Sequence, residues 1–215
     1  MKELGGDMLG SAEVGHSEAL LREAATTLAA GGLVVVVDEA ALNGAGRGFF
    51  LHAAALATTE TVNTAILHGR GITCFSVTPE QAMRLGLMMA GEYRPDHQGP
   101  LFLRSVEAAE CDGTGISAED RALTLRAAGS PTAGIASLKS PGHVVPAMTR
   151  GQTQPTRAVA DIALDTLRHL TEHEVAAWTD ILDDDGEVAT AIWCQDLADR
   201  LGIVQLRAAD VASPA

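Results

Sequence analysis

The stretch TGISAEDRALTLRA, residues 114–127, constrains the fold most narrowly, because in it a polar loop passes directly into a helix. Ser117 is followed three residues later by Asp120, which is the spacing of a helix-capping pattern. The pattern predicts a helix over 120–129. Because capping explains both polar side chains, their spacing alone does not indicate contact with a ligand.

Helices and strands alternate on both sides of this stretch. The run LVVVV at 33–37 has the β-branched density of a fully buried strand, and SEALLREAATTLAA at 17–30 has apolar residues at helical spacing. Further helices are predicted at 58–67, from Thr78, at 157–170 and at 196–201, and further strands at 71–78, 101–108, 176–183 and 202–206. This alternation predicts a single α/β (α+β) domain over 1–215, with a mixed sheet, flanking helices and a flexible segment at 1–16.

Composition narrows the class of protein. The chain has 215 residues, a net charge of −13 and only 3% aromatic residues, so we expect a core of Ala, Val, Leu and Ile and no nucleic-acid partner. Its three cysteines are far apart, which argues against a disulfide framework. The longest apolar run, 31–37, is too short to span a bilayer. We therefore expect a cytoplasmic protein with a small-molecule substrate and no membrane partner.

Five sequence motifs follow one another along the chain. These are AAGGLVVVVDE (29–39), HGRGITCFSVTPEQAMRLGL (68–87), TGISAEDRALTLRA, SPGHVVPA (140–147) and ILDDDGEVA (181–189). Together they resemble 3,4-dihydroxy-2-butanone 4-phosphate synthase, a family of the riboflavin pathway. The resemblance implies that family's fold and a homodimer with active sites near the subunit interface. It also implies a Mg²⁺ or Mn²⁺ enzyme that converts ribulose 5-phosphate to formate and a four-carbon phosphate.

The sequence departs from the family in its acidic loop. The family carries a dense acidic run, of the form DDEDRENEGD, after its first strand. Here the equivalent loop begins with Asp38 and Glu39, and residues 40–47 then contain no carboxylate and end in Arg47. Because Mg²⁺ prefers oxygen ligands, this loop lacks part of the expected metal site.

A second departure falls on the family's RxGHTEA motif, which corresponds to QTQPTRA at 152–158. On this match, Pro155 replaces the metal-binding His, Arg157 replaces the neighbouring Glu, and Gln152 replaces the phosphate-contacting Arg. Proline cannot ligate a metal, and a cation beside it would repel one. We therefore predict that the ancestral Mg²⁺ or Mn²⁺ site is lost and that no cofactor is used.

Other positions of the family's site are retained. His143, Cys74 and Asp180, the last in place of a family Glu, are the candidate proton-transfer residues. Arg47, Arg150 and Arg157 are possible new contacts for an anion. The candidate substrate-binding residues are Thr114, Ser117, Asp120, Arg121, Arg150, Thr156, Arg157, Asp38 and Glu39.

Each candidate also has a purely structural interpretation. Cys74, within a predicted strand, suits packing as well as nucleophilic chemistry. His143 follows Pro-Gly and is equally compatible with a loop histidine bonded to backbone. His52 lies in an apolar stretch, and we expect it to be a satisfied core or interface residue.

Three functions remain open. We favour a repurposed, metal-independent enzyme of specialised metabolism that isomerises, dehydrates, cyclises or condenses a small metabolite, because metal ligands are lost while pocket motifs persist. The first alternative is a non-catalytic binding or regulatory subunit. The second is the orthodox Mg²⁺-dependent synthase. The fold alone cannot separate these functions, because function resides in the site.

Overall fold

The computed structural model describes residues 7–92, 99–151 and 157–211, with side chains described from Ser17 onward. These residues form one mixed sheet of eight strands in the order β4-β6-β3-β7-β2-β1-β8, with β5 paired to β6. The strands are Val34–Asp38 (β1), Arg47–Ala53 (β2), Arg70–Val77 (β3), Leu101–Phe102 (β4), Val106–Ala108 (β5), Leu138–Met148 (β6), Ala176–Ile181 (β7) and Gln205–Arg207 (β8). The predicted mixed sheet with flanking helices is thus confirmed.

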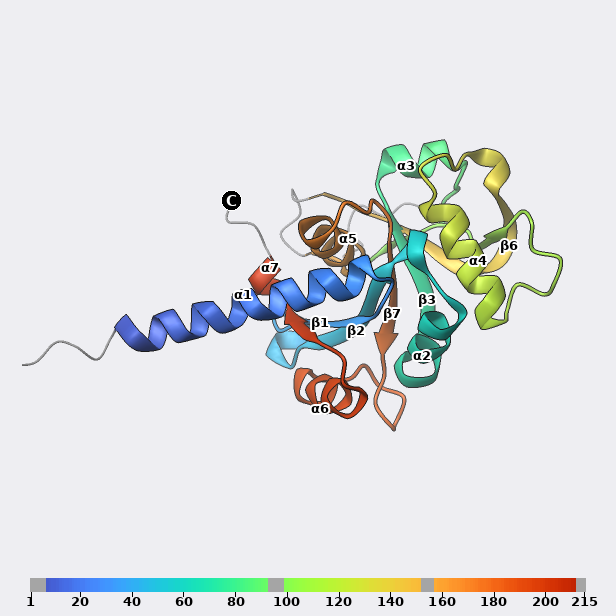
Figure 1. The fold of residues 1–215 in the computed structure, drawn as a ribbon. Coiled ribbons are helices and arrows are strands. Elements are labelled where there is room, and N and C mark those ends of the chain that lie inside the picture. The colour runs from blue at the N-terminus through green and yellow to red at the C-terminus, as the bar shows by residue number, and fades with distance from the viewer. Residues whose placement is uncertain (1–6, 93–98, 152–156, 212–215) are drawn as a thin grey trace, which may run out of the picture.

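Helices cover both faces of the sheet (Figure 1). They are Asp7–Ala29 (α1), Thr59–Gly69 (α2), Pro79–Arg84 (α3), Ala118–Gly129 (α4), Val159–Leu170 (α5), Ala191–Leu201 (α6) and Ala208–Val211 (α7). Short 3-10 turns occur at Leu42–Gly44, Ala54–Leu56 and Ile135–Ser137. Helices α1 and α5 pack on one face of the sheet, while α2, α4 and α6 pack on the other. In the described part of the chain no helix is long and apolar enough to cross a membrane.

The helix starts follow their capping signals. Thr78 and Gln81 form a reciprocal capping box at α3, and the hydroxyl oxygen of Ser117 accepts from the backbone N–H of Asp120 at 3.0 Å. Helix α1 begins at Asp7, well upstream of the predicted start, so residues 7–16 are helical. They extend past the body of the protein in Figure 1. Helix α6 also begins earlier than predicted, because Thr190 caps it.

The predicted strand at 101–108 is in fact two strands, and both pair with β6, which contains a bulge. Strand β5 pairs Val106 with Val144 but Glu107 with Lys139, so β6 bulges around Pro141 and Gly142. A Cβ on Gly142 would lie only 2.0 Å from the carbonyl carbon of Val106. Backbones can approach this closely only at a glycine. This bulge lies opposite β5, between Val106 and Glu107, whereas β4 already ends at Phe102 and Leu103 then forms an isolated bridge with Met89.

The core is aliphatic, as the composition predicts, and is organised around one tryptophan. Trp178 on β7 is 1% exposed, and its indole N–H donates to the Ser76 hydroxyl at 3.0 Å. Its ring meets Phe49 edge-on, with centroids 6.5 Å apart. The side chains around them are mostly Ala, Val and Leu from α1, α5 and the sheet. The buried indole is therefore both packed and hydrogen-bonded.

His52 is a buried core residue on β2, which confirms its predicted burial. It is 2% exposed, and its Nδ1 atom has no hydrogen-bond partner among the described residues. The expectation that both ring nitrogens would be hydrogen-bonded is therefore not met. Burial lowers the pKa of His52 to about 4, although a hydrogen bond involving the backbone of Ala53 opposes the shift. The imidazole is neutral in the folded protein at neutral pH.

The burial of His52 predicts acid sensitivity. Its folded pKa lies below the ordinary value of 6.5, so the unfolded chain takes up a proton first as the pH falls. The associated stability is complete above about pH 7 and is lost as the pH falls from 6.5 towards 4, with a loss of about 2 kcal/mol between pH 7 and pH 5. In His52→Leu, we expect the free energy of unfolding, measured with urea, to show no such loss between pH 7 and pH 5. The exposed-residue control His169→Leu should keep the loss, and an unchanged loss in His52→Leu would contradict the assignment.

Candidate functional site

Three of the candidate positions converge where β1, β2 and β7 meet. Asp38 pairs with Arg47 across β1 and β2, and Phe49, two residues after Arg47, pairs with Asp180 on β7. Because side chains alternate along a strand, Arg47 and Asp180 share one face of the sheet and meet diagonally. The guanidinium of Arg47 donates to the carboxylate of Asp180. This loop cation is therefore neutralised by the candidate acid–base residue.

The ion pair is partly desolvated. The side chains of Arg47 and Asp180 are 24% and 23% exposed, and the buried Nε of Arg47 has no partner among the described residues. In this environment the pair is screened less than a fully exposed one. Asp38 accepts from the backbone N–H of Ala40 at 3.2 Å, whereas Glu39 is exposed. The loop after β1 thus offers an arginine held on an aspartate in place of a row of carboxylates.

Cys74 lies directly below this pair, in the core. It is 0% exposed and packs in the same cluster as Trp178 and Phe49. Burial raises the pKa of the Cys74 thiol well above its usual value, and the negative charge of Asp180 raises it further. The nucleophilic form of cysteine is the thiolate, so a thiol in this environment is unreactive. The geometry favours packing over the catalytic role predicted for Cys74.

His143 belongs to a second group, built around Gly115. Gly115 has a φ of +76°, and a Cβ placed on it would lie 2.0 Å from Oε2 of Glu107 and 3.1 Å from Nδ1 of His143. The carboxylate and the imidazole thus both lie against the side of Gly115 that lacks a side chain, although no hydrogen bond or ion pair joins them. His143 is exposed, and Glu107 also lies 3.4 Å from the ammonium of Lys139. Glu107 was not among the residues singled out from the sequence, although its place shortly before TGISAEDR is a signal that could have identified it.

The polar residues of the TGISAEDR loop mostly satisfy one another. A hydrogen bond from the Cys111 thiol holds the pKa of Asp120 below its usual range, with a further contribution from the Ser117 hydroxyl. Burial, followed by its hydrogen bond to Asp120, raises the pKa of Cys111. Thr114 is exposed, so its hydroxyl can reach a ligand. Ser117 and Asp120 thus have the structural role that their capping pattern indicates.

Arg121 points towards the sheet. Its Nη1 donates to the Thr73 hydroxyl at 3.2 Å, and its buried Nε has no partner among the described residues. Burial lowers the pKa of Arg121, which is still positive at neutral pH. A partly buried cation without a carboxylate partner in the described structure is suited to hold an anion, or to fix α4 on β3.

The remaining candidates lie at the start of α5. Arg157 pairs with Asp165, whose pKa is raised by burial in spite of the opposing charge of Arg157. The backbone N–H of Arg150 donates to Asp161 at 2.8 Å. Thr156, Pro155 and Gln152 lie outside the described residues. The guanidinium of Arg157 is thus already paired with a carboxylate on α5, which weakens the predicted role of Arg157 as an anion contact.

The described residues do not assemble a metal centre. Within 7–92, 99–151 and 157–211, no three His, Cys, Asp or Glu side chains lie close enough to share a metal ion. The carboxylate of Asp180, which could serve as a ligand, already accepts from a guanidinium. The donor set in this part of the chain therefore does not fit the Mg²⁺ or Mn²⁺ that the motifs imply.

Comparison with known proteins gives one consistent family. The sequence profile of 3,4-dihydroxy-2-butanone 4-phosphate synthase matches residues 22–213. The synthase of Proteus mirabilis is 35% identical over 182 residues, covering 83% of this chain and 82% of that protein. The Pseudomonas aeruginosa synthase is 34% identical over 160 residues, but this chain spans only 43% of its length.

Solved structures agree with these relatives. A two-domain synthase from A. baumannii has a TM-score of 0.77 and 26% identity, and the match covers 91% of this chain and 56% of that one. A synthase in complex with two magnesium ions has a TM-score of 0.75 and 28% identity, covering 87% and 92%. The expected family fold is thus confirmed. This chain belongs to the 3,4-dihydroxy-2-butanone 4-phosphate synthase family.

Proposed function

We propose that this family member is a metal-independent enzyme that transfers protons on a small metabolite carrying a carboxylate or phosphate. The observation that carries the proposal is the ion pair between Arg47 and Asp180. A guanidinium in the loop after β1 repels a divalent cation, and at the same time it occupies a carboxylate that could have bound one. The sheet end then presents an ion pair between two side chains in place of a carboxylate that is free to bind a metal.

The absence of suitable ligands in the described residues supports the same proposal. A relative of known structure binds two magnesium ions, whereas the described residues of this chain hold no three potential ligands in reach of one ion. Hard cations need several oxygen ligands, and the loop from Ala40 to Arg47 offers no carboxylate. Any reaction at this site would therefore rely on side chains alone.

His143 and Glu107 are the proposed acid–base pair. The exposed imidazole would exchange a proton with the substrate, and the carboxylate that faces the same side of Gly115 would be a second proton-transfer group. Arg121 would contribute positive charge for an anionic substrate group. Isomerisation, dehydration, cyclisation and condensation all proceed through such proton transfers, and none of them needs a redox cofactor.

We also propose that the enzyme acts as a homodimer. Two large apolar side chains are exposed in segments of the candidate site, Ile72 at 54% on β3 and Ile116 at 53% in the TGISAEDR loop. A second copy covering them would bury apolar surface and shield the neighbouring His143 from bulk water. The family resemblance independently implies an active site near a subunit interface.

The proposal predicts that the orthodox reaction is absent. We expect purified protein, supplied with Mg²⁺ and ribulose 5-phosphate, to release no formate above a buffer control, because the described side chains do not assemble a cation site. The Proteus mirabilis synthase serves as the positive control in the same assay. Formate release that depends on Mg²⁺ would instead establish the orthodox synthase.

Metal-independent turnover is the matching positive prediction. We expect protein treated with EDTA to transform a component of a metabolite extract, detected by mass spectrometry, and His143→Gln to reduce that turnover by on the order of a hundredfold, the usual contribution of a general acid–base group. Glu119→Gln, on an exposed α4 residue, is the control. If neither wild-type protein nor control transforms any component and the protein co-purifies with a partner, the non-catalytic alternative gains support.

The absence of a side chain at Gly115 leads to a structural prediction. In Gly115→Ala the new methyl group would collide with Oε2 of Glu107, so the flexible carboxylate should swing away from His143. The control is Gly186→Ala, because Gly186 has a similar φ of +83° but no atoms within 4 Å of the added carbon. Both variants should lose about 1–2 kcal/mol of stability from the left-handed backbone. Only Gly115→Ala should move the His143 imidazole signals in an NMR spectrum, and equal shifts in both variants would refute the pairing.

A further inference from the structure

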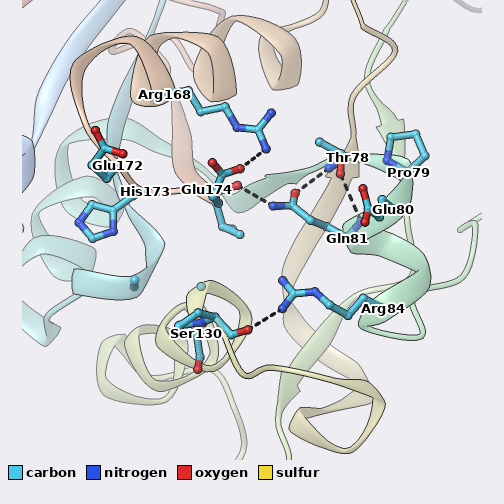
Figure 2. A pocket seen from close by; sticks show the side chains of 14 residues that line it. Thr78, Pro79, Glu80, Gln81, Arg84, Ser130, Arg168, Glu172, His173 and Glu174 are labelled. Atoms are coloured by element: carbon cyan, nitrogen blue, oxygen red, sulfur yellow. Dashed lines mark hydrogen bonds and ion pairs between the residues drawn. The ribbon is translucent and has the colours of Figure 1, made fainter.

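A second concave site lies at the other end of the sheet from His143. Its volume is about 930 Å³, within the range of about 300–1,000 Å³ typical of small-molecule sites. The walls come from the start of α3, the end of α4 and the loop that follows α5, as Figure 2 shows. None of the candidate residues of the first site lines it. Nothing in the proposed chemistry accounts for this cavity.

Hydrogen bonds of the Gln81 side chain position the walls of the cavity. Gln81 is 8% exposed, and both ends of its amide are used. Its Nε2 donates to the backbone carbonyl of Glu174 at 2.9 Å, and its Oε1 accepts from the backbone N–H of Thr78 at 2.8 Å. The first bond joins α3 to the loop after α5, the second completes the cap of α3, and Ala55 and Val175 add apolar lining. The walls are therefore largely formed before any ligand arrives.

One wall carries a cation without an acidic partner. Arg84 donates from Nη1 to the backbone carbonyl of Pro131 at 3.0 Å, which is a neutral acceptor. Among the described residues, no carboxylate forms an ion pair with Arg84. Guanidinium has five N–H donors, so several remain for a ligand. In Figure 2 its guanidinium lies at the edge of the open space.

The opposite wall carries an anion without a basic partner. Glu172 makes no hydrogen bond or ion pair with any residue that the structure describes, and it lies across the view from Arg84 in Figure 2. The nearby Arg168 is already bound to Glu174. Glu172 also follows the C-terminal end of α5, whose carbonyls add partial negative charge to this side. Charges of both signs without an ion-pair partner among the described residues thus line one cavity, with Arg84 and Glu80 on α3 and Glu172 in the loop after α5.

We propose that this cavity binds a small zwitterionic metabolite, with its carboxylate or phosphate on Arg84 and its ammonium group on Glu172. Arg84 and Glu172 are both exposed at the walls of the cavity, so each uncompensated charge can be reached by a ligand group of opposite sign. A ligand that carries only one of the two charged groups can form an ion pair with only one of the two side chains. This site is separate from the proposed proton-transfer chemistry and does not depend on it.

The test uses ω-amino acids as probes. We expect 4-aminobutanoate or 6-aminohexanoate, titrated into the full chain and followed by NMR, to bind on the order of tenfold more tightly than butylamine, hexylamine, butanoate or hexanoate. Arg84→Gln and Glu172→Gln should each reduce this preference to less than about twofold. Arg207→Gln and Glu119→Gln, outside the cavity, should preserve it, and circular dichroism checks that all four variants are folded.

Several outcomes would overturn the proposal. Equal binding of zwitterions and single-charge probes would remove the requirement for both walls. Wild-type binding by Arg84→Gln and Glu172→Gln would place the contact elsewhere. Preference for a single-charge anion that is lost only in Arg84→Gln would redefine the cavity as an anion site. The activity assays on His143 are independent of all these results.

Discussion

Strand β7 is hydrogen-bonded on both edges, to β2 and β3, and the alternation of its side chains governs both the core and the site. Trp178 enters the core and bonds Ser76, whereas Asp180, two residues later on the same face, reaches the sheet end and binds Arg47. Thr179 points to the opposite face, where α2 and α4 pack. A shift of one residue in the β7 register would remove Trp178 from the core and break the ion pair together.

The same face links stability to chemistry. Cys74 lies in the core cluster beneath Asp180, and its raised pKa keeps it a neutral thiol. An uncharged group at that depth allows the Arg47–Asp180 pair to remain the main charged feature of the sheet end. The second group, His143 with Glu107, depends on two glycines instead. Gly142 lets β5 approach the bulged β6, and Gly115 leaves space for the carboxylate beside the imidazole.

Local sequence signals predicted much of the fold. Capping residues located the starts of α3 and α4, and the β-branched run located β1, because these signals act over a few neighbouring residues. Two boundaries were predicted less well. Strand β4 ends at Phe102, where Leu103 turns to a bridge with Met89, a contact between separate segments of the chain. The start of α6 follows a local Thr190 cap that the apolar pattern alone does not locate.

The sequence by itself determined the family and the fold class, because both follow from the order of motifs along the chain. It also showed that residues 40–47 lack the carboxylates of the family's acidic loop and end in Arg47. Only the tertiary structure decided that Arg47 binds Asp180, that Cys74 is buried in the core, and that Glu107 and His143 both lie against Gly115. These outcomes depend on strand register and on contacts between residues far apart in sequence. Such contacts are set by packing of the whole sheet, which no short stretch of sequence encodes.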